Sequence, residues 1–114
     1  MLWQNLDIAG YTGLDFVGSK RSTTACNIDY DPDNEGHSGF LATDIADQNL
    51  LVPWLSSANP DIVLMHLGTN DIWHKNLGAN IILAAFTKLV GQMRANNPHM
   101  KIIVSNLPRV KYSR

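Results

Sequence analysis

The stretch that decides the fold is PDIVLMHLGTND, residues 60–71. Its first part, residues 61–67, is almost continuously apolar, which is typical of a central parallel strand covered on both faces. The apolar run then gives way to the four residues GTND, and small or polar residues of this kind turn the chain after a strand. Parallel sheets bind ligands beyond the carboxyl ends of their strands. We therefore predict that Asn70 lies at an edge of the sheet where a ligand site forms.

Hydrophobic spacing predicts the elements that follow this strand. Apolar residues at helical spacing mark one face of a long helix: Ile82, Phe86, Leu89, Val90 and Met93. That helix must end near Asn97, because Pro98 comes next. Residues 101–105, KIIVS, predict a second buried strand.

The elements before the strand are less regular. Residues 2–9 predict a helix that a glycine ends, and residues 14–17, LDFV, predict a short strand. Turn-forming and polar residues fill a long loop over residues 20–39. Residues 40–56 predict a helix that Pro53 should kink or break in its second half. Because helices separate the strands, the connections are crossovers, which produce an α/β fold with a parallel sheet.

The composition narrows the classes of partner. The chain has 114 residues, enough for one domain with a modest core, and a formal net charge of −1 without blocks of either sign. We therefore expect neither nucleic acid nor a membrane as a partner. No apolar run approaches the roughly 18 residues of a membrane-spanning helix, and the first residues have no secretory signal pattern. The residues alone thus indicate a cytosolic protein, or a mature or partial chain.

Neither a metal nor a cofactor is expected. The four histidines are scattered, and Asp29, Asp31 and Asp33 alternate without the glycine and the terminal glutamate of a calcium loop. We interpret these aspartates as a solvated acidic loop. The single cysteine, Cys26, cannot form an internal disulfide. It is either a free small residue or half of a disulfide with a partner in a longer chain.

Two motifs each allow two interpretations. Residues 34–39, NEGHSG, precede a predicted helix, where glycines and free N–H groups suit an anion, but simple capping by Ser38 explains the same pattern. In GTND, Asn70 is either part of a plain turn or a side-chain amide that donates to an oxyanion.

Taken together, these motifs resemble those of a known protein family. The sequence resembles the SGNH, or GDSL-type, hydrolases, and within them the fungal acetylxylan esterase branch of carbohydrate esterases. The shared segments are FVGS at residues 16–19, EGHSG at 35–39, DIA at 44–46, PDIVLMHLGTND at 60–71 and FTKLVGQMRANNPHMKIIV at 86–104. The resemblance implies a flavodoxin-like three-layer α/β/α sandwich with a parallel sheet, of which residues 1–114 form a single partial domain.

The resemblance also implies an activity. Such proteins hydrolyse esters through a serine acyl-enzyme, here with acetylated xylan, a related polysaccharide or a small ester as the substrate, and in an extracellular location. Gly39, by its backbone N–H, and Asn70, by its side chain, match the two oxyanion-hole positions of the family. The family's serine lies in a GDS motif, and its Asp and His lie in a D-x-x-H motif near the C-terminus. No GDS occurs in this sequence, so we assign no nucleophile and no general base.

Residues 71–74 also spell D-x-x-H, but their Asp71 belongs to the GTND block. We expect Asp71 to brace the turn and His74 to be an exposed loop residue. His66 is expected in the core, and His99 is expected to be exposed.

Substrate contacts are predicted for His37 and Trp73, with His37 alternatively ordering its own loop, whereas Trp54 is interpreted as helix packing. Because triad members act as a unit, a chain with only the oxyanion hole should be a very poor esterase. The alternative function is therefore a catalytically inactive, truncated remnant that binds a carbohydrate or a protein. The oligomeric state stays open.

Overall fold

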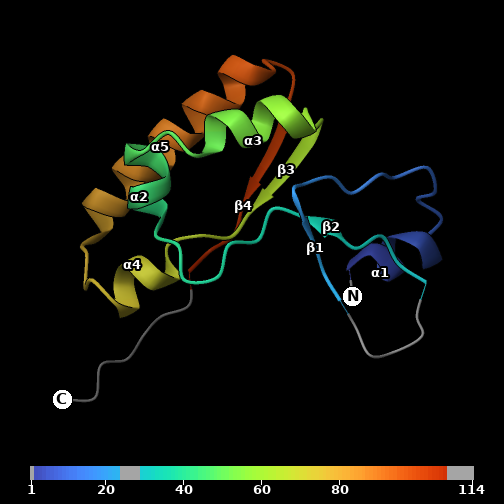
Figure 1. The fold of residues 1–114 in the computed structure, drawn as a ribbon, viewed down its shortest axis with the longest axis horizontal. Helices are drawn as coiled ribbons and strands as arrows, with labels where there is room; N and C mark the ends of the chain where they lie inside the picture. The colour runs from blue at the N-terminus through green and yellow to red at the C-terminus, as the bar shows by residue number, and fades with distance from the viewer. Residues whose placement is uncertain (1, 24–28, 108–114) are drawn as a thin grey trace. The chain divides into compact units, whose positions relative to one another are not determined.

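The structure is a computed structural model that describes residues 2–23 and 29–107. The chain divides into two compact units, Met1–Gly36 and His37–Arg114. Figure 1 shows the helices and strands of both. Within the described residues, no helix is long and apolar enough to cross a membrane.

The first unit begins with helix α1, Leu2–Ile8. The helix ends where Gly10 adopts a φ of +90° and Tyr11 donates its N–H to the carbonyl of Leu6 at 2.9 Å. This is the left-handed glycine ending that the sequence predicted. Two short strands follow, β1 (Lys20–Arg21) and β2 (Asp33–Asn34), which pair antiparallel inside the segment predicted as a loop.

The predicted strand at residues 14–17 is absent from the described structure. The N–H of Phe16 donates to the carboxylate of Asp31 at 2.8 Å instead of joining a strand ladder. Asp33 is also engaged, in an ion pair with Arg21 at 3.5 Å. Two members of the acidic loop therefore hold the backbone and a side chain of this unit, and they are not simply solvated.

The second unit contains the parallel sheet. Its elements, in order, are α2 (Ala42–Asp47), α3 (Leu51–Ala58), β3 (Ile62–Met65), α4 (Thr69–Trp73), α5 (Ala79–Asn96) and β4 (Lys101–Val104). Strands β3 and β4 pair in parallel, from Ile62 opposite Lys101 to Met65 opposite Val104. The predicted α/β fold with a parallel sheet is confirmed. The long helix ends at Asn96, next to its predicted end.

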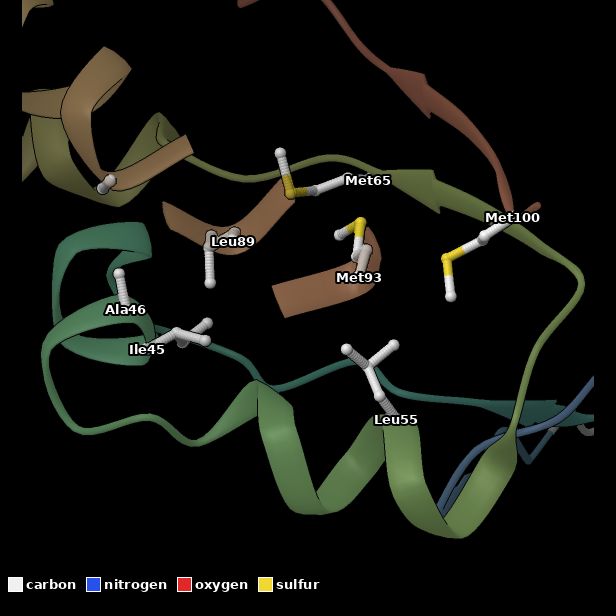
Figure 2. Close-up of a cluster of buried hydrophobic side chains, with 8 residues drawn as sticks. Ile45, Ala46, Leu55, Met65, Leu89, Met93 and Met100 are labelled. Atoms are coloured by element: carbon white, nitrogen blue, oxygen red, sulfur yellow. The ribbon is translucent and has the colours of Figure 1, made fainter. Parts of the chain in front are cut away.

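The core lies between the sheet and helices α2, α3 and α5. Leu89 and Met93 of α5 are almost fully buried, on the face that the spacing predicted. Figure 2 shows them between the sheet residue Met65 and the side chains that α2 and α3 contribute. Unbranched methionines adapt to irregular spaces, which suits a core shared by several elements.

Among the described residues of this unit, helices cover one face of the sheet. Ile62, Leu64 and Ile103 are 52%, 57% and 57% exposed, whereas Met65 is buried. The expectation of a strand covered on both faces is therefore wrong for this structure, because helices α2, α3 and α5 pack on one side of the sheet (Figure 1). Side chains alternate between faces along a strand, and His66 is exposed like Leu64. The prediction of a core histidine at position 66 was wrong for the same reason.

The predicted helix over residues 40–56 is divided, but not by Pro53. The break lies between α2 and α3, where Asn49 has a φ of +53°. Because Leu50 is the N-cap of α3, Pro53 falls in the first turn of that helix. The first N–H groups of a helix have no intrahelical acceptor, so a residue without an N–H is tolerated there.

Candidate active site

A turn at residues 37–40, here called the Gly39 turn, precedes α2. The N–H of Phe40 donates to the carbonyl of His37 at 3.3 Å, and Gly39 has a φ of +80°. A positive φ at the third position is the geometry of a type II turn, which selects glycine. A Cβ on Gly39 would meet no atom within 4 Å, so backbone conformation and not space requires the glycine.

Asn70 lies beside this turn. Gly68, with a φ of +99°, is the N-cap of α4, so that Asn70 falls in the first turn of the short helix after β3. Its side-chain amide donates to the carbonyl of Phe40 at 3.1 Å. The two residues predicted to form an oxyanion hole, Gly39 and Asn70, are thus joined through the neighbouring residue.

Asp71 is completely buried and is used structurally. Its carboxylate accepts hydrogen bonds from the N–H of Ala42 at 2.8 Å, the N–H of Thr43 at 3.1 Å and the hydroxyl of Thr43 at 2.8 Å. The N-cap residue of α2 is Leu41, whose side chain makes no cap hydrogen bond, so Asp71 caps that helix from a distance in sequence. The prediction that Asp71 braces its own turn was wrong in its target, because the carboxylate accepts these hydrogen bonds from α2.

His74 is the C-cap of α4 and is exposed, as predicted. Among the described residues, no hydrogen bond or ion pair joins it to the carboxylate of Asp71, which points at α2. The D-x-x-H of residues 71–74 is therefore not a dyad in this structure. His99 is exposed, as expected.

The two predicted substrate contacts differ in their surroundings. Trp73 is 66% exposed and lies one helical turn after Asn70 on α4, so both are on one face. His37 is half-buried, and its ring stacks on Trp54 with centroids 4.1 Å apart. Trp54 packs against the core, as expected of helix packing. The contact of Trp54 with the Gly39 turn was not predicted from the sequence, because no residue spacing links α3 to that turn.

The hydrogen bond from Asn70 to Phe40 links a side-chain amide to the turn that carries the Gly39 N–H. In the part of the chain that the structure describes, no hydrogen bond uses the N–H of Gly39, and only the bond to Phe40 uses the Asn70 amide. Fixed donors of this kind suit a developing oxyanion. The described residues contain no group of three or more His, Cys, Asp or Glu side chains that could hold a metal ion. Cys26 lies outside the described residues.

Comparison with known proteins identifies the family. The family model described as the GDSL-like Lipase/Acylhydrolase family matches residues 10–114. A curated multidomain esterase from Ruminococcus flavefaciens is 27% identical over 122 residues, which cover 87% of this chain and 15% of that protein.

Solved structures are similar as well. A carbohydrate esterase family 3 protein from Talaromyces cellulolyticus has 40% identity and a TM-score of 0.83, over 90% of this chain and 51% of its own. A mutant acetyl esterase with an acetate ion has the same values. A family 3 carbohydrate esterase from Clostridium thermocellum has 33% identity and a TM-score of 0.74, over 90% of this chain and 47% of its own. The chain spans about half the length of these solved relatives. It belongs to the GDSL-like lipase/acylhydrolase family, as its sequence motifs predicted.

Proposed function

We propose that this chain is the oxyanion-binding part of an extracellular carboxylic ester hydrolase, which deacetylates acetylated xylan or a related polysaccharide. The observation that carries the proposal is the hydrogen bond from the Asn70 amide to the carbonyl of Phe40, next to Gly39. This bond ties the Asn70 amide to the turn that carries the backbone N–H of Gly39, which supports the proposal. Similarity to an acetyl esterase and to carbohydrate esterases supports the acetyl group and the carbohydrate.

The reaction begins when a serine oxygen attacks the acetyl carbonyl and the C=O double bond opens to an oxyanion. The N–H of Gly39 and the second N–H of Asn70 donate to that oxygen. The histidine of the catalytic pair takes the serine proton during the attack. When the tetrahedral intermediate collapses and the ester bond breaks, the histidine gives that proton to the leaving sugar oxygen, which departs as a hydroxyl, and water then hydrolyses the acyl-serine to acetate and free serine. Trp73 and His37 contact the sugar or acyl group. This sequence contains no GDS motif for the serine, and its D-x-x-H at residues 71–74 belongs to the GTND block and not to the catalytic pair.

The coding sequence on both sides of this chain gives the first test. We expect an upstream GDS and a downstream D-x-x-H in the same reading frame. The protein that contains them should release acetate from acetylated xylan. Finding neither motif would leave the alternative, an inactive remnant that binds a carbohydrate or a protein.

Substitution of Asn70 gives the second test. In the acetate-releasing protein, Asn70→Ala should lower kcat by about 10²- to 10³-fold, because one oxyanion donor is lost. The matched control is Asn80→Ala, an exposed asparagine in the first turn of α5, which should leave kcat unchanged. Equal kcat in both variants would rule out the oxyanion role of Asn70.

The 114-residue chain tests the alternative directly. With p-nitrophenyl acetate, we expect turnover close to that of buffer, since a triad is absent from the sequence. Turnover well above buffer that falls in Asn70→Ala would contradict the inactive-remnant alternative.

A further inference from the structure

Three aromatic rings meet at the Gly39 turn. The His37 ring lies 4.1 Å from the Trp54 ring at an interplanar angle of 10°, and 4.9 Å from the Phe40 ring at 26°. Phe40 and Trp54 are 6.5 Å apart. These separations lie near or within the range in which aromatic pairs attract each other beyond their burial. His37 therefore contacts both of the other rings.

His37 and Phe40 are the first and last residues of the Gly39 turn. Gly39 has no side chain, is exposed, and has no hydrogen bond from its N–H within the described residues. Contacts of its neighbours must therefore determine where its N–H points. On the C-terminal side these contacts are the Asn70 bond to Phe40 and the Asp71 bonds to α2. On the N-terminal side, the stack of His37 on Trp54 supplies such a contact.

Trp54 is a fixed support for this stack. It lies on α3 beside Leu55, which is 4% exposed, and its ring packs against the core. Pro53 in the first turn of α3 further restricts the backbone next to it. Immobile side chains around a site hold reacting groups in a productive geometry, and a displacement of about 1 Å can cost 10²-fold in rate.

We propose that Trp54 is a positioning residue, which holds the ring of His37 and thereby orients the N–H of Gly39 for an oxyanion. The inference rests on the proposed function, because it needs Gly39 to be an oxyanion donor. It adds to that function a role for α3, a helix that contributes no predicted donor. A residue that only filled the core would stabilise the fold without controlling the order of the Gly39 turn.

A positioning role and a core-filling role of Trp54 can be separated without measuring turnover. The test is the backbone order at Gly39, measured by ¹⁵N relaxation on the 114-residue chain. The order parameter of a rigid backbone N–H is about 0.85, and that of a flexible one is below about 0.6. We expect Trp54→Ala to lower the value at Gly39 from the rigid to the flexible range, and Trp54→Phe to retain it. Trp73→Ala, which truncates the exposed tryptophan of α4, should leave the Gly39 value unchanged.

A second variant keeps the test valid if Trp54→Ala does not fold. His37→Ala leaves Trp54 in the core and should loosen Gly39 to the same extent, with the amide signals of β3 and β4 unchanged. An ordered Gly39 in His37→Ala overturns the inference, whatever the activity.

The effect on activity is measured in the protein that contains the GDS and D-x-x-H motifs and releases acetate from acetylated xylan. His37→Ala should lower kcat by about 10- to 100-fold. Trp54→Phe, which keeps an aromatic ring against His37, should retain most of the rate. A loosened Gly39 with unchanged kcat would refute Gly39 as an oxyanion donor, and with it the proposed function of the turn. Loss of kcat together with loss of order at Gly39 supports both the positioning role of Trp54 and the oxyanion role of Gly39.

Discussion

The carboxylate of Asp71 accepts two hydrogen bonds from Thr43, one from its backbone N–H at 3.1 Å and one from its hydroxyl at 2.8 Å. The two residues are 28 positions apart and lie on different helices, α4 and α2. This relationship fixes the helix that carries Asn70 against the helix that the Gly39 turn enters. The distance between the two predicted donors therefore depends on Asp71, a fully buried residue that is not one of them.

Removal of the Asp71 carboxylate should be strongly destabilising. Asp71→Ala leaves two N–H groups at the start of α2 without their acceptor, and we expect the free energy of unfolding to fall by about 3 kcal/mol. Urea denaturation followed by circular dichroism measures the change. Asp47→Ala, an exposed aspartate at the other end of α2, should change stability by less than about 0.5 kcal/mol. A similar loss in both variants would contradict the capping role.

The Thr43 hydroxyl provides an independent check on the same contact. Thr43→Val keeps the side-chain shape and removes one hydrogen bond to a charged acceptor, which should cost about 1.5–3 kcal/mol. Because that bond needs the carboxylate, the same substitution should cost far less in the Asp71→Ala background. Equilibrium unfolding of the four proteins of this double-mutant cycle gives the coupling. Additive costs would show that Thr43 acts through something other than Asp71.

The sequence predicted the parts of the fold that depend on local pattern. Continuous apolar residues identified β3 and β4, helical spacing identified the buried face of α5, and a glycine marked the end of α1. The sequence-based prediction was wrong where burial depends on which other elements pack against a residue. His66 looked like a core residue because the chain around it is apolar, but burial depends on what covers that face of the sheet.

In the candidate site, too, the sequence predicted features of single residues but not contacts that depend on packing. The motifs singled out Gly39 and Asn70 as candidate donors, because a glycine's positive φ and a side-chain amide are properties of single residues. The contact between Trp54 and His37 depends on how α3 packs, and no residue spacing in the sequence encodes that packing. The capping of α2 by Asp71 was likewise foreseen only as a local brace.

Three glycines of the second unit should respond differently to alanine. Gly91 lies inside α5 with open space around it, so Gly91→Ala should stabilise by about 0.5–1 kcal/mol. Gly39→Ala should cost about 1–2 kcal/mol from its positive φ alone. At Gly68, the new Cβ would also lie 2.9 Å from Leu107 and 3.3 Å from Phe86, so the cost should be larger still. Thermal unfolding of the three variants should give this order, and a Gly68→Ala protein as stable as Gly39→Ala would contradict the close packing.

The uncovered sheet face should promote association of the 114-residue chain with itself. Leu64 and Ile103 are opposite each other on β3 and β4, and each is 57% exposed. Adjacent exposed apolar side chains mark an association surface, whereas scattered ones are ordinary. Threonine keeps the preference for a strand and removes apolar area, so Leu64→Thr combined with Ile103→Thr should lower the mean particle mass seen by light scattering. The matched control is Ile81→Thr combined with Leu83→Thr, at two residues of α5 that are 53% and 59% exposed, which removes similar area on the helical side. An equal decrease for this control would assign the association to general hydrophobicity and not to the sheet.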